Sequence, residues 1–273
     1  MAADTATTQD TLSIDRIRQD LSARTVGHRL CLYDTVPSTN LVLRDLARSG
    51  AAEGTVVLAE AQTAGQGRSG KTWFSPPGVN LYASILLRPA IPPAAAPVFT
   101  FAASLALADA VVELGLTPAI KWPNDLLVGG RKVAGVRAEM ATTGDALEYV
   151  ILGVGVNLNV SREALRQALG EAGQAATSLA TALGRPVDRS AFVAAFLNAL
   201  DEWLVIYRER GAPALLAAWR DLDVVTGRRV EVREGAVAFD GRALGVAASG
   251  HLEVQDALGR IHEVVGAEIR LLE

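Results

Sequence analysis

The stretch that decides the fold is residues 54–80, Gly-Thr-Val-Val-Leu-Ala-Glu-Ala-Gln-Thr-Ala-Gly-Gln-Gly-Arg-Ser-Gly-Lys-Thr-Trp-Phe-Ser-Pro-Pro-Gly-Val-Asn. Its glycines match two nucleotide-binding patterns. The first is Gly65-x-x-x-x-Gly70-Lys71-Thr72, the Walker A spacing, and the second is Gly65-x-Gly67-x-x-Gly70, the dinucleotide fingerprint. In both patterns a helix must follow directly, because its N-terminus holds the anion.

Pro76 and Pro77 argue against such a helix, because proline removes backbone donors from its first turns. Residues 81–88 also lack the carboxylate that the dinucleotide fingerprint requires. The stretch is therefore predicted to be a glycine-rich, basic loop between two strands. We expect its glycines at 65, 67 and 70 to allow positive φ and close approach to a ligand. Arg68 and Lys71 would carry positive charge to that ligand.

The remainder of the chain predicts an irregular mixture of strands and helices, several of them joined by hairpins. Strands are predicted at 30–34, 56–60, 81–88, 119–122, 125–128, 131–140 and 147–156. Helices are predicted at 13–23, 39–49, 100–114, 161–170, 175–183, 189–209 and 213–221. Because the two kinds do not alternate regularly, the expected class is α+β, a mixed β-sheet flanked by helices.

Three details of the helices are also predicted. Ser38 or Thr39 is expected to cap the helix at 39–49, with Arg44 and Arg48 on its solvent side. The helix at 100–114 is read as amphipathic.

From residue 223 onward the pattern changes to short alternating runs separated by turns. These runs, at 229–233, 236–239, 242–248, 251–255 and 260–265, predict a small five-stranded β-barrel. The expected organisation is a short N-terminal segment with one helix (1–26), a large domain (27–221) and a small C-terminal domain (222–273).

Composition excludes several classes of protein. The single cysteine, Cys31, rules out an internal disulfide framework, and the three histidines show no metal-ligand spacing. A net charge of −4 argues against nucleic-acid binding as the main activity. Apolar runs shorter than roughly 18 residues argue against a membrane span, and residues 1–10 show no export signal. A cytoplasmic location is expected.

Residues 62–75 resemble the biotin-adenylate loop of biotin protein ligases. Three further motifs follow in that family's order: Pro37-Ser38-Thr39-Asn40, then Lys121-Trp122-Pro123-Asn124-Asp125 with 131–136 (Arg-Lys-Val-Ala-Gly-Val), then 153–159 (Gly-Val-Gly-Val-Asn-Leu-Asn). Four ordered matches over about 120 residues are a specific signal. The resemblance implies a fold related to class II aminoacyl-tRNA synthetases, with an SH3-like C-terminal domain.

The resemblance also implies a two-step reaction. Biotin and ATP would form biotinyl-5'-AMP, and biotin would then pass to a lysine of a biotin carboxyl carrier protein. ATP, Mg²⁺ and biotin are thus expected to bind, with the metal ligands left unassigned. A homodimer is possible within the family. Residues 1–26 are too few for the winged helix of the family's repressors, so no DNA binding is expected. No membrane partner is expected either, because the apolar runs are short.

Site residues follow from the same matches. Lys132 is the first choice to bridge the biotin carboxylate and the α-phosphate, Asp125 to orient or deprotonate the acceptor amine, and Arg68 to close over the intermediate. Biotin-binding residues implied by the resemblance are Ser38, Thr39, Asn40, Gln62, Gln66, Gly67, Arg68, Lys132 and Gly135. ATP-binding residues implied are Arg68, Lys71, Trp73, Lys121, Asn124, Lys132 and Asn157. Gln66 is a departure, since relatives commonly carry a second arginine there.

Two other functions compete with this interpretation, and a third is less favoured. A lipoate–protein ligase or related acyltransferase of the same fold would replace the groups that read the ureido ring with an apolar slot. A non-enzymatic binding module would need none of the cations. A P-loop nucleotide-binding protein is the least favoured reading, because no helix is expected after Thr72.

Overall fold

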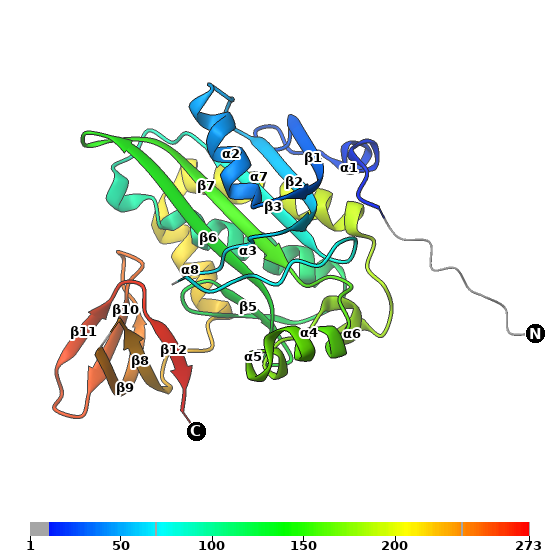
Figure 1. Ribbon diagram of the computed structural model, residues 1–273. Helices are drawn as coiled ribbons and strands as arrows, with labels where there is room; N and C mark the ends of the chain where they lie inside the picture. Colours follow the sequence, from blue (N-terminus) through cyan, green and yellow to red (C-terminus); the bar gives the residue numbers. More distant parts are fainter. Residues whose placement is uncertain (1–10, 69, 236, 273) are drawn as a thin grey trace, which may run out of the picture.

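The computed structural model describes residues 11–272 apart from Ser69 and Ala236. Its main sheet has seven strands in the order β1-β2-β3-β7-β6-β5-β4 (Figure 1). They are β1 (Arg29–Val36), β2 (Thr55–Gln62), β3 (Leu81–Leu87), β4 (Pro118–Lys121), β5 (Asp125–Val128), β6 (Arg131–Thr143) and β7 (Ala146–Val156). β1 and β2 run parallel, whereas the other neighbours are antiparallel. The predicted mixed sheet is confirmed.

Helices cover both faces of this sheet (Figure 1). They are α1 (Ile14–Asp20), α2 (Thr39–Arg48), α3 (Val98–Glu113), α4 (Arg162–Leu169), α5 (Glu171–Gln174), α6 (Leu179–Leu183), α7 (Arg189–Arg210) and α8 (Ala212–Leu222), with a short 3-10 turn at Pro93–Ala95. α2 packs on β2, β3 and β7, and α3 lies between the sheet and α7. The two faces therefore carry separate apolar clusters.

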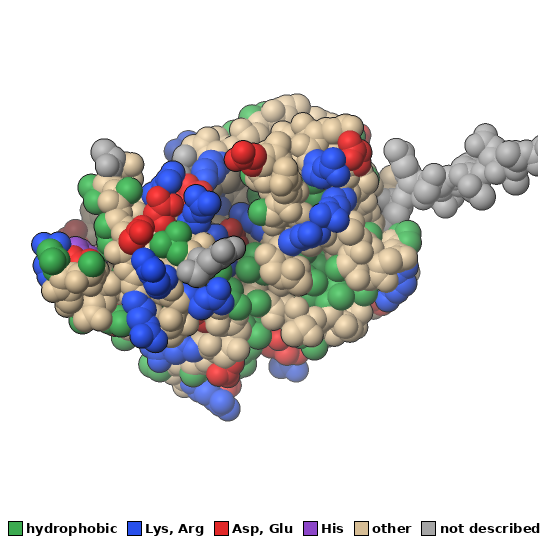
Figure 2. Space-filling view, turned by 90° about the horizontal axis from the view of Figure 1, so that it is seen from below, with side chains coloured by type: hydrophobic (Ala, Val, Ile, Leu, Met, Phe, Trp, Pro, Cys, Tyr) green, Lys and Arg blue, Asp and Glu red, His purple; other side chains and the backbone are tan. Residues whose placement is uncertain are grey.

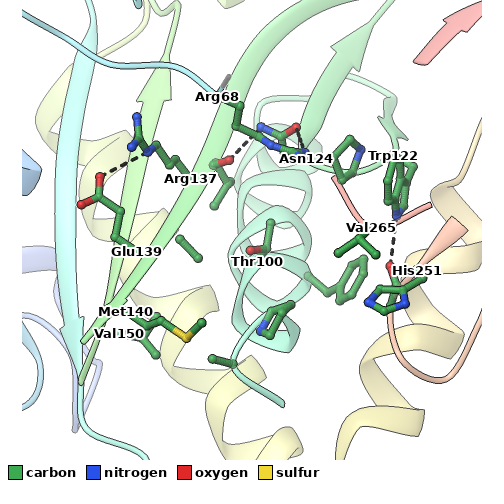
Figure 3. A pocket seen from close by; sticks show the side chains of 17 residues that line it. Arg68, Thr100, Trp122, Asn124, Arg137, Glu139, Met140, Val150, His251 and Val265 are labelled. Carbon is green, nitrogen blue, oxygen red and sulfur yellow. Dashed lines mark hydrogen bonds and ion pairs between the residues drawn. The ribbon is translucent and has the colours of Figure 1, made fainter. Parts of the chain in front are cut away.

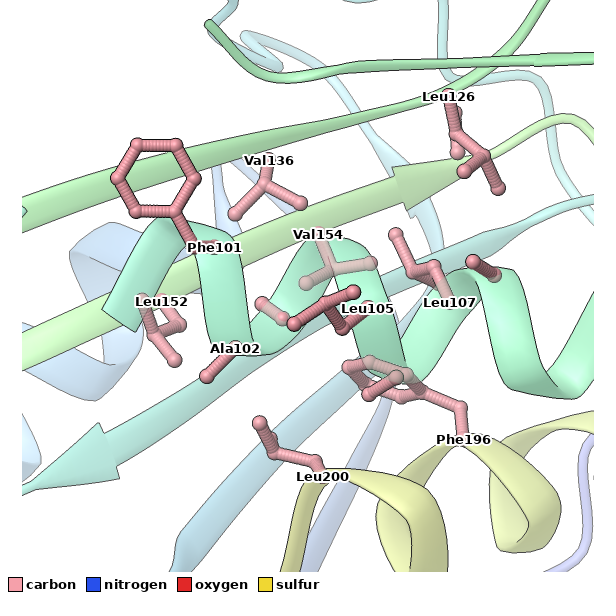
Figure 4. Packing of buried hydrophobic residues seen from close by; sticks show 14 of the residues in the cluster. Phe101, Ala102, Leu105, Leu107, Leu126, Val136, Leu152, Val154, Phe196 and Leu200 are labelled. Carbon is pink, nitrogen blue, oxygen red and sulfur yellow. The ribbon is translucent and has the colours of Figure 1, made fainter. Parts of the chain in front are cut away.

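α3 is buried on nearly all sides, which corrects the expectation of an amphipathic helix. Figure 4 shows Phe101 and Leu105 of α3 among sheet residues such as Val154 and Leu152, with Phe196 of α7 close by. A helix enclosed by a sheet and two other helices has no solvent face to make polar.

Two stretches pass the length and hydropathy test for a membrane span, which corrects the exclusion drawn from run length. They are Pro93–Glu113 and Arg189–Arg210, and 72% and 56% of their apolar windows are buried inside the protein. Burial within the core accounts for their apolar character.

The predicted helix at 175–183 is shorter in the structure because its first residues pair with the sheet. The Lys132 N–H donates to Ala175 O at 2.9 Å, and the Thr177 N–H donates to Lys132 O at 2.9 Å. The helix α6 begins only after Ser178, whose hydroxyl accepts from the Thr181 N–H. This pairing holds residues 175–177 beside Lys132.

The C-terminal strands form a five-stranded antiparallel sheet in the order β11-β10-β9-β8-β12, consistent with an SH3-like domain. They are β8 (Arg229–Glu234), β9 (Val237–Val246), β10 (Leu252–Asp256), β11 (Ile261–Val264) and β12 (Glu268–Leu271). The strands predicted at 236–239 and 242–248 form one continuous strand, β9. The strand β12 was not predicted. The turn expected near Gly241 is absent because this glycine lies within β9, where a Cβ would stand 2.6 Å from Gln255 O.

The carboxylate of Asp201 in α7 holds the end of the N-terminal segment. Asp201 accepts the N–H groups of Arg24 at 2.8 Å, Thr25 at 2.9 Å and Val26 at 3.2 Å. Burial alone would raise the pKa of Asp201, but these hydrogen bonds outweigh it and hold the pKa below its usual value.

We expect Asp201→Ala to lower the free energy of unfolding by about 2–3 kcal/mol, because three backbone donors lose a charged acceptor. Asp201→Asn, which keeps one oxygen, should lose about half as much. Because the folded pKa is depressed, the stabilisation is complete above the unfolded pKa of about 3.9 and disappears as the pH falls through the folded value. Urea unfolding of the wild type and both variants from pH 7 to pH 2 measures this, and a constant difference at all pH values would contradict it.

Candidate functional site

A cavity of about 590 Å³ lies on the α2 face of the sheet, between the glycine-rich loop, β6, β7 and β12. Every predicted site residue lines it: Ser38, Thr39, Asn40, Gln62, Gln66, Gly67, Arg68, Lys71, Trp73, Lys121, Asn124, Asp125, Lys132, Gly135 and Asn157. These residues come from segments up to about 120 positions apart in sequence. The tertiary structure thus joins the four motifs in one place.

Cations are concentrated at this cavity. The chain has only three lysines, Lys71, Lys121 and Lys132, and all three line it together with Arg68 and Arg137. Figure 2 shows Lys and Arg side chains prominent around a hollow in the face seen from below Figure 1. The cavity is suited to an anionic ligand.

Lys132 and Asp125 form an ion pair, with Nζ 2.5 Å from Oδ1. Both residues come from the β5–β6 hairpin, where Asp125 pairs with Gly135 and a register shift follows Leu126. Lys132 Nζ also lies 5.4 Å from the centroid of the Trp73 ring. The carboxylate and the indole together hold the ammonium at the middle of the cavity.

The other two lysines differ in their environment. Burial lowers the pKa of Lys121, the Asp125 carboxylate opposes this shift, and the positive charge of Lys132 adds to it. Lys71 is more exposed and forms a 2.6 Å ion pair with Glu268 of β12, which lowers the pKa of that carboxyl group. The C-terminal sheet therefore contributes a side chain to the wall of the cavity.

Arg68 also reaches across to neighbouring elements. Its Nη1 donates to Asn124 Oδ1 at 3.1 Å, and its Nη2 donates to Gly266 O at 2.8 Å. Burial lowers its pKa, while the Asp125 carboxylate raises it. A partly desolvated guanidinium gains more from a ligand anion than an exposed one.

The loop itself is a small hairpin. Gln66 and Thr72 form an antiparallel bridge, the Gly67 N–H donates to Lys71 O at 2.7 Å, and the Trp73 N–H donates to Gly65 O at 2.9 Å. The prediction of positive φ is correct for Gly70 (φ 74°) and wrong for the other two glycines. Gly65 is required for space instead, since a Cβ there would lie 2.6 Å from Ser75 Oγ.

No helix follows Thr72. The chain continues through Pro76 and Pro77 to β3 without a helix, which excludes the Walker A and dinucleotide interpretations.

The opposite end of the cavity is polar. Gln62 Oε1 accepts from the Thr39 N–H at 3.0 Å, and Ser84 Oγ donates to Asn40 Oδ1 at 2.5 Å and lies 2.7 Å from Thr39 Oγ1. Ser38 occupies the N-cap position of α2 but makes no side-chain capping bond. The capping prediction is therefore wrong, because the side chain of Gln62 accepts from the first turn in place of both hydroxyls.

An aromatic ring packed on two glycines lines the cavity between its polar and charged parts. The Trp73 ring lies against Gly155 and Gly135, where a Cβ at Gly155 would collide with the ring. The buried Trp73 Nε1 has no hydrogen-bond partner among the described residues. Trp122 is 2% exposed and donates from Nε1 to Gly250 O at 3.1 Å, which makes it chiefly a core residue that also borders the cavity.

Asn124 and Asn157 hold the backbone around the cavity. The Asn124 amide donates to Val136 O at 2.8 Å, and its oxygen accepts from Arg68. Asn157 is buried and donates to Thr177 O at 3.1 Å. Each asparagine links the sheet to a segment that lines the site.

Several lining residues were not identified from the sequence. One group is an apolar wall beside Lys132 and Asn157, formed by Leu169, Ala172, Ala175 and Ala176. Its composition resembles any helical surface, so no local signal marks it. The other is Arg137 on β6, which lines the cavity and forms an ion pair with Glu139, two residues further along the strand. The alternation of these two residues with Val136 and Ala138 could have indicated two charged residues on the α2 face.

Arg44 was expected on the solvent side of α2, but in the structure its side chain pairs with Glu139. Arg44 Nη2 lies 2.8 Å from Glu139 Oε2, and Asn40 Nδ2 donates to Glu139 Oε1 at 2.9 Å. α2 is therefore fastened to β6 by a carboxylate that the helix pattern does not reveal.

A second cavity, of about 410 Å³, lies on the other face of β6, between α3 and the C-terminal sheet (Figure 3). Its lining is largely apolar, with Phe101, Met140 and Val265 among the residues. The residues that line both cavities are Arg68, Trp122, Pro123, Asn124, Val136 and Arg137.

Comparison with known proteins places this site in a family. Residues 32–157 match the model of the biotin/lipoate A/B protein ligase family. The chain is 33% identical to the bifunctional ligase/repressor BirA of Bacillus subtilis over 95% of this chain and 79% of the relative. It is also 33% identical to the biotin–[acetyl-CoA-carboxylase] ligase of Mycobacterium tuberculosis, over 80% and 83%.

A solved structure agrees with the sequence relatives. The biotin protein ligase from Aquifex aeolicus in complex with biotin and ATP superposes with a TM-score of 0.73 at 26% identity, covering 90% of this chain and 100% of that one. Together with the convergence of the four motifs on one cavity, these matches show that the chain belongs to the biotin/lipoate A/B protein ligase family.

Proposed function

We propose that this protein is an ATP-dependent biotin protein ligase. It forms biotinyl-5'-AMP from biotin and ATP and then transfers biotin to a lysine of a biotin carboxyl carrier protein. The observation that carries this proposal is the position of all three lysines around one cavity, with a polar cluster at its opposite end. The relatives and the solved complex favour biotin over the lipoate alternative.

The polar end suits the ureido ring of biotin. A ureido group has two donors and a strong acceptor, and it would cost a few kcal/mol if it were buried without partners. Ser38 supplies a hydroxyl that no helix cap uses, and Thr39, Asn40 and Gln62 surround it. The flat Trp73 ring would pack on either the apolar bicycle of biotin or the purine of ATP.

In the first step the biotin carboxylate attacks the α-phosphorus of ATP. A bond forms between the carboxylate oxygen and phosphorus, and pyrophosphate leaves. Both reactants are anions. Lys132 lines the cavity, and its backbone N–H donates to the carbonyl oxygen of Ala175 in the apolar wall, so its ammonium group would contact both the biotin carboxylate and the α-phosphate. A cation about 4 Å from an anion contributes a gross Coulomb energy of about 4 kcal/mol at an effective dielectric of 20.

The apolar wall formed by Leu169, Ala172, Ala175 and Ala176 would hold the purine, beside Asn157. Lys71, Lys121 and Arg68 would neutralise the phosphates and the leaving pyrophosphate. Such preorganised cations act chiefly on the charge that develops in the transition state.

In the second step a carrier lysine attacks the biotinyl carbonyl carbon, and AMP leaves. The free amine has a pKa of about 10.4 and is mostly protonated at neutral pH, so it must lose a proton before it attacks. Asp125 would take this role, and its ion pair with Lys132 would then loosen when the amine arrives. The same pair orients Lys132 during the first step.

Magnesium would enter with ATP and neutralise charge on its phosphates. Among the described residues no three His, Cys, Asp or Glu side chains cluster as a metal site. The nearby carboxylates, Asp125 and Glu268, are each paired with a lysine. This donor set fits an ion held mainly by substrate phosphates. The cytoplasmic location, the homodimer and the absence of DNA binding stay predictions.

ATP–pyrophosphate exchange tests this function. The wild type should catalyse exchange with biotin at least 100-fold faster than with lipoate, and it should then biotinylate an isolated carrier domain. Exchange supported equally by lipoate would favour the acyltransferase alternative. No exchange with either acid would favour a non-enzymatic binding module.

A further inference from the structure

A second guanidinium approaches the glycine-rich loop, and it comes from the sheet. Arg137 Nη1 donates to Gly67 O at 2.7 Å and to Gln66 Oε1 at 3.1 Å. Gly67 is the residue directly before Arg68. The carbonyl that Arg137 holds therefore belongs to the peptide bond that leads into Arg68.

Arg137 is itself held in place. Its Nε lies 3.2 Å from Glu139 Oε1, and Glu139 is fixed from the other side by Arg44 and Asn40. These contacts connect α2, β6 and the loop in one network. Figure 3 shows the Arg137–Glu139 contact beside the pair formed by Arg68 and Asn124.

The arrangement also gives Gln66 a specific purpose. A neutral amide oxygen can accept from Arg137 at this distance, whereas an arginine at position 66 would place a second positive charge against the first. The remaining Nη2 of Arg137 has no acceptor among the described residues, and the side chain lines the ligand cavity.

Resting on the proposed ligase function, we infer that Arg137 is a positioning residue for the adenylate step. It fastens Gly67 to β6 and thereby aims Arg68 into the cavity, and it replaces from the sheet the charge that Gln66 does not supply from the loop. Arg137 and Gln66 act as a pair, so the effects of changing them are not additive.

A double-mutant cycle tests this inference. Arg137→Leu should speed the dissociation of biotinyl-AMP by about tenfold, the equivalent of one charge-assisted hydrogen bond. Gln66→Arg alone should also speed release, because it adds a like charge beside Arg137. The double variant Gln66→Arg/Arg137→Leu should return to within about threefold of the wild type. The dissociation rate of Arg137→Lys should lie between those of the wild type and Arg137→Leu, because lysine keeps the charge but loses the forked geometry.

The controls separate positioning from folding and from the function itself. Arg185→Leu, an exposed arginine outside both cavities, should release biotinyl-AMP at the wild-type rate. Thermal unfolding of Arg137→Leu should stay within a few degrees of the wild type, since Glu139 keeps two other partners. Wild-type release by Arg137→Leu, or strictly additive effects in the double variant, would overturn the inference. Failure of the wild type to form biotinyl-AMP would instead overturn the proposed function.

Discussion

Lys132→Ala is expected to reduce biotin-dependent ATP–pyrophosphate exchange by about 10³-fold. Removal of one preorganised donor to a developing oxyanion typically costs 10²- to 10³-fold in rate, and in the proposed mechanism Lys132 contacts both anionic reactants. Its side chain is 34% exposed, so its contribution to folding is about 1 kcal/mol at most. Exchange kinetics and thermal unfolding should be measured on the same preparation. Near-normal exchange would remove Lys132 from the catalytic assignment.

Asp125→Asn supplies the matched comparison, because it changes the other half of the same ion pair. If Asp125 acts on the acceptor amine, transfer from pre-formed biotinyl-AMP to the carrier should slow more than adenylate formation does. If the two half-reactions slow equally, Asp125 serves mainly to orient Lys132 or to bind ATP. Single-turnover measurements of each half-reaction separate these results.

Arg68→Gly is expected to raise the dissociation rate of biotinyl-AMP by roughly 10- to 150-fold. A charge-assisted hydrogen bond to the ligand phosphate contributes about 1.5–3 kcal/mol, and such losses appear mainly in the dissociation rate. The escaped anhydride would then acylate lysines on unrelated proteins. Stopped-flow release and a blot for non-specific biotinylation measure the two effects.

The structure sharpens this prediction, since Arg68 already contacts Asn124 and Gly266 O. For Arg68 to act as a clamp, ligand phosphate must compete with those partners and the loop must tighten on binding. Hydrogen exchange of residues 65–71 should therefore slow when biotinyl-AMP is added. Equal protection with and without the adenylate, together with an unchanged release rate in Arg68→Gly, would identify the loop as a rigid turn. Arg185→Gly is the matched control on the exposed surface.

Much of the site was predictable because its chemistry lies in contiguous runs. The charged residues Arg68, Lys121, Asp125 and Lys132 stand within short motifs whose prolines and glycines also shape the backbone. The exclusion of a P-loop needed only Pro76 and Pro77. The hairpin of β5 and β6 has an equally local signal, because only Gly129-Gly130 separates the strands predicted at 125–128 and 131–140. These two glycines have φ of 56° and 73° in the structure.

The errors share a physical cause. In the sequence Gly241 indicates a turn. In the structure it lies within β9, where the missing side chain allows β10 to approach closely. Residues 175–177 have helical composition, yet they pair with Lys132 because the sheet offers unsatisfied backbone groups. In both places tertiary contact overrode local propensity.

The sequence by itself determined the reaction class, the mixed sheet and four of the cations, Arg68 and the three lysines, because those depend on residue identity and on spacing within a few positions. Only the tertiary structure decided which groups meet. The bond from Arg137 to Gly67 joins residues 70 positions apart, and the bond from Arg68 to Gly266 joins residues 198 apart. Such contacts have no local signature, since they arise from how strands and loops pack once the core has formed.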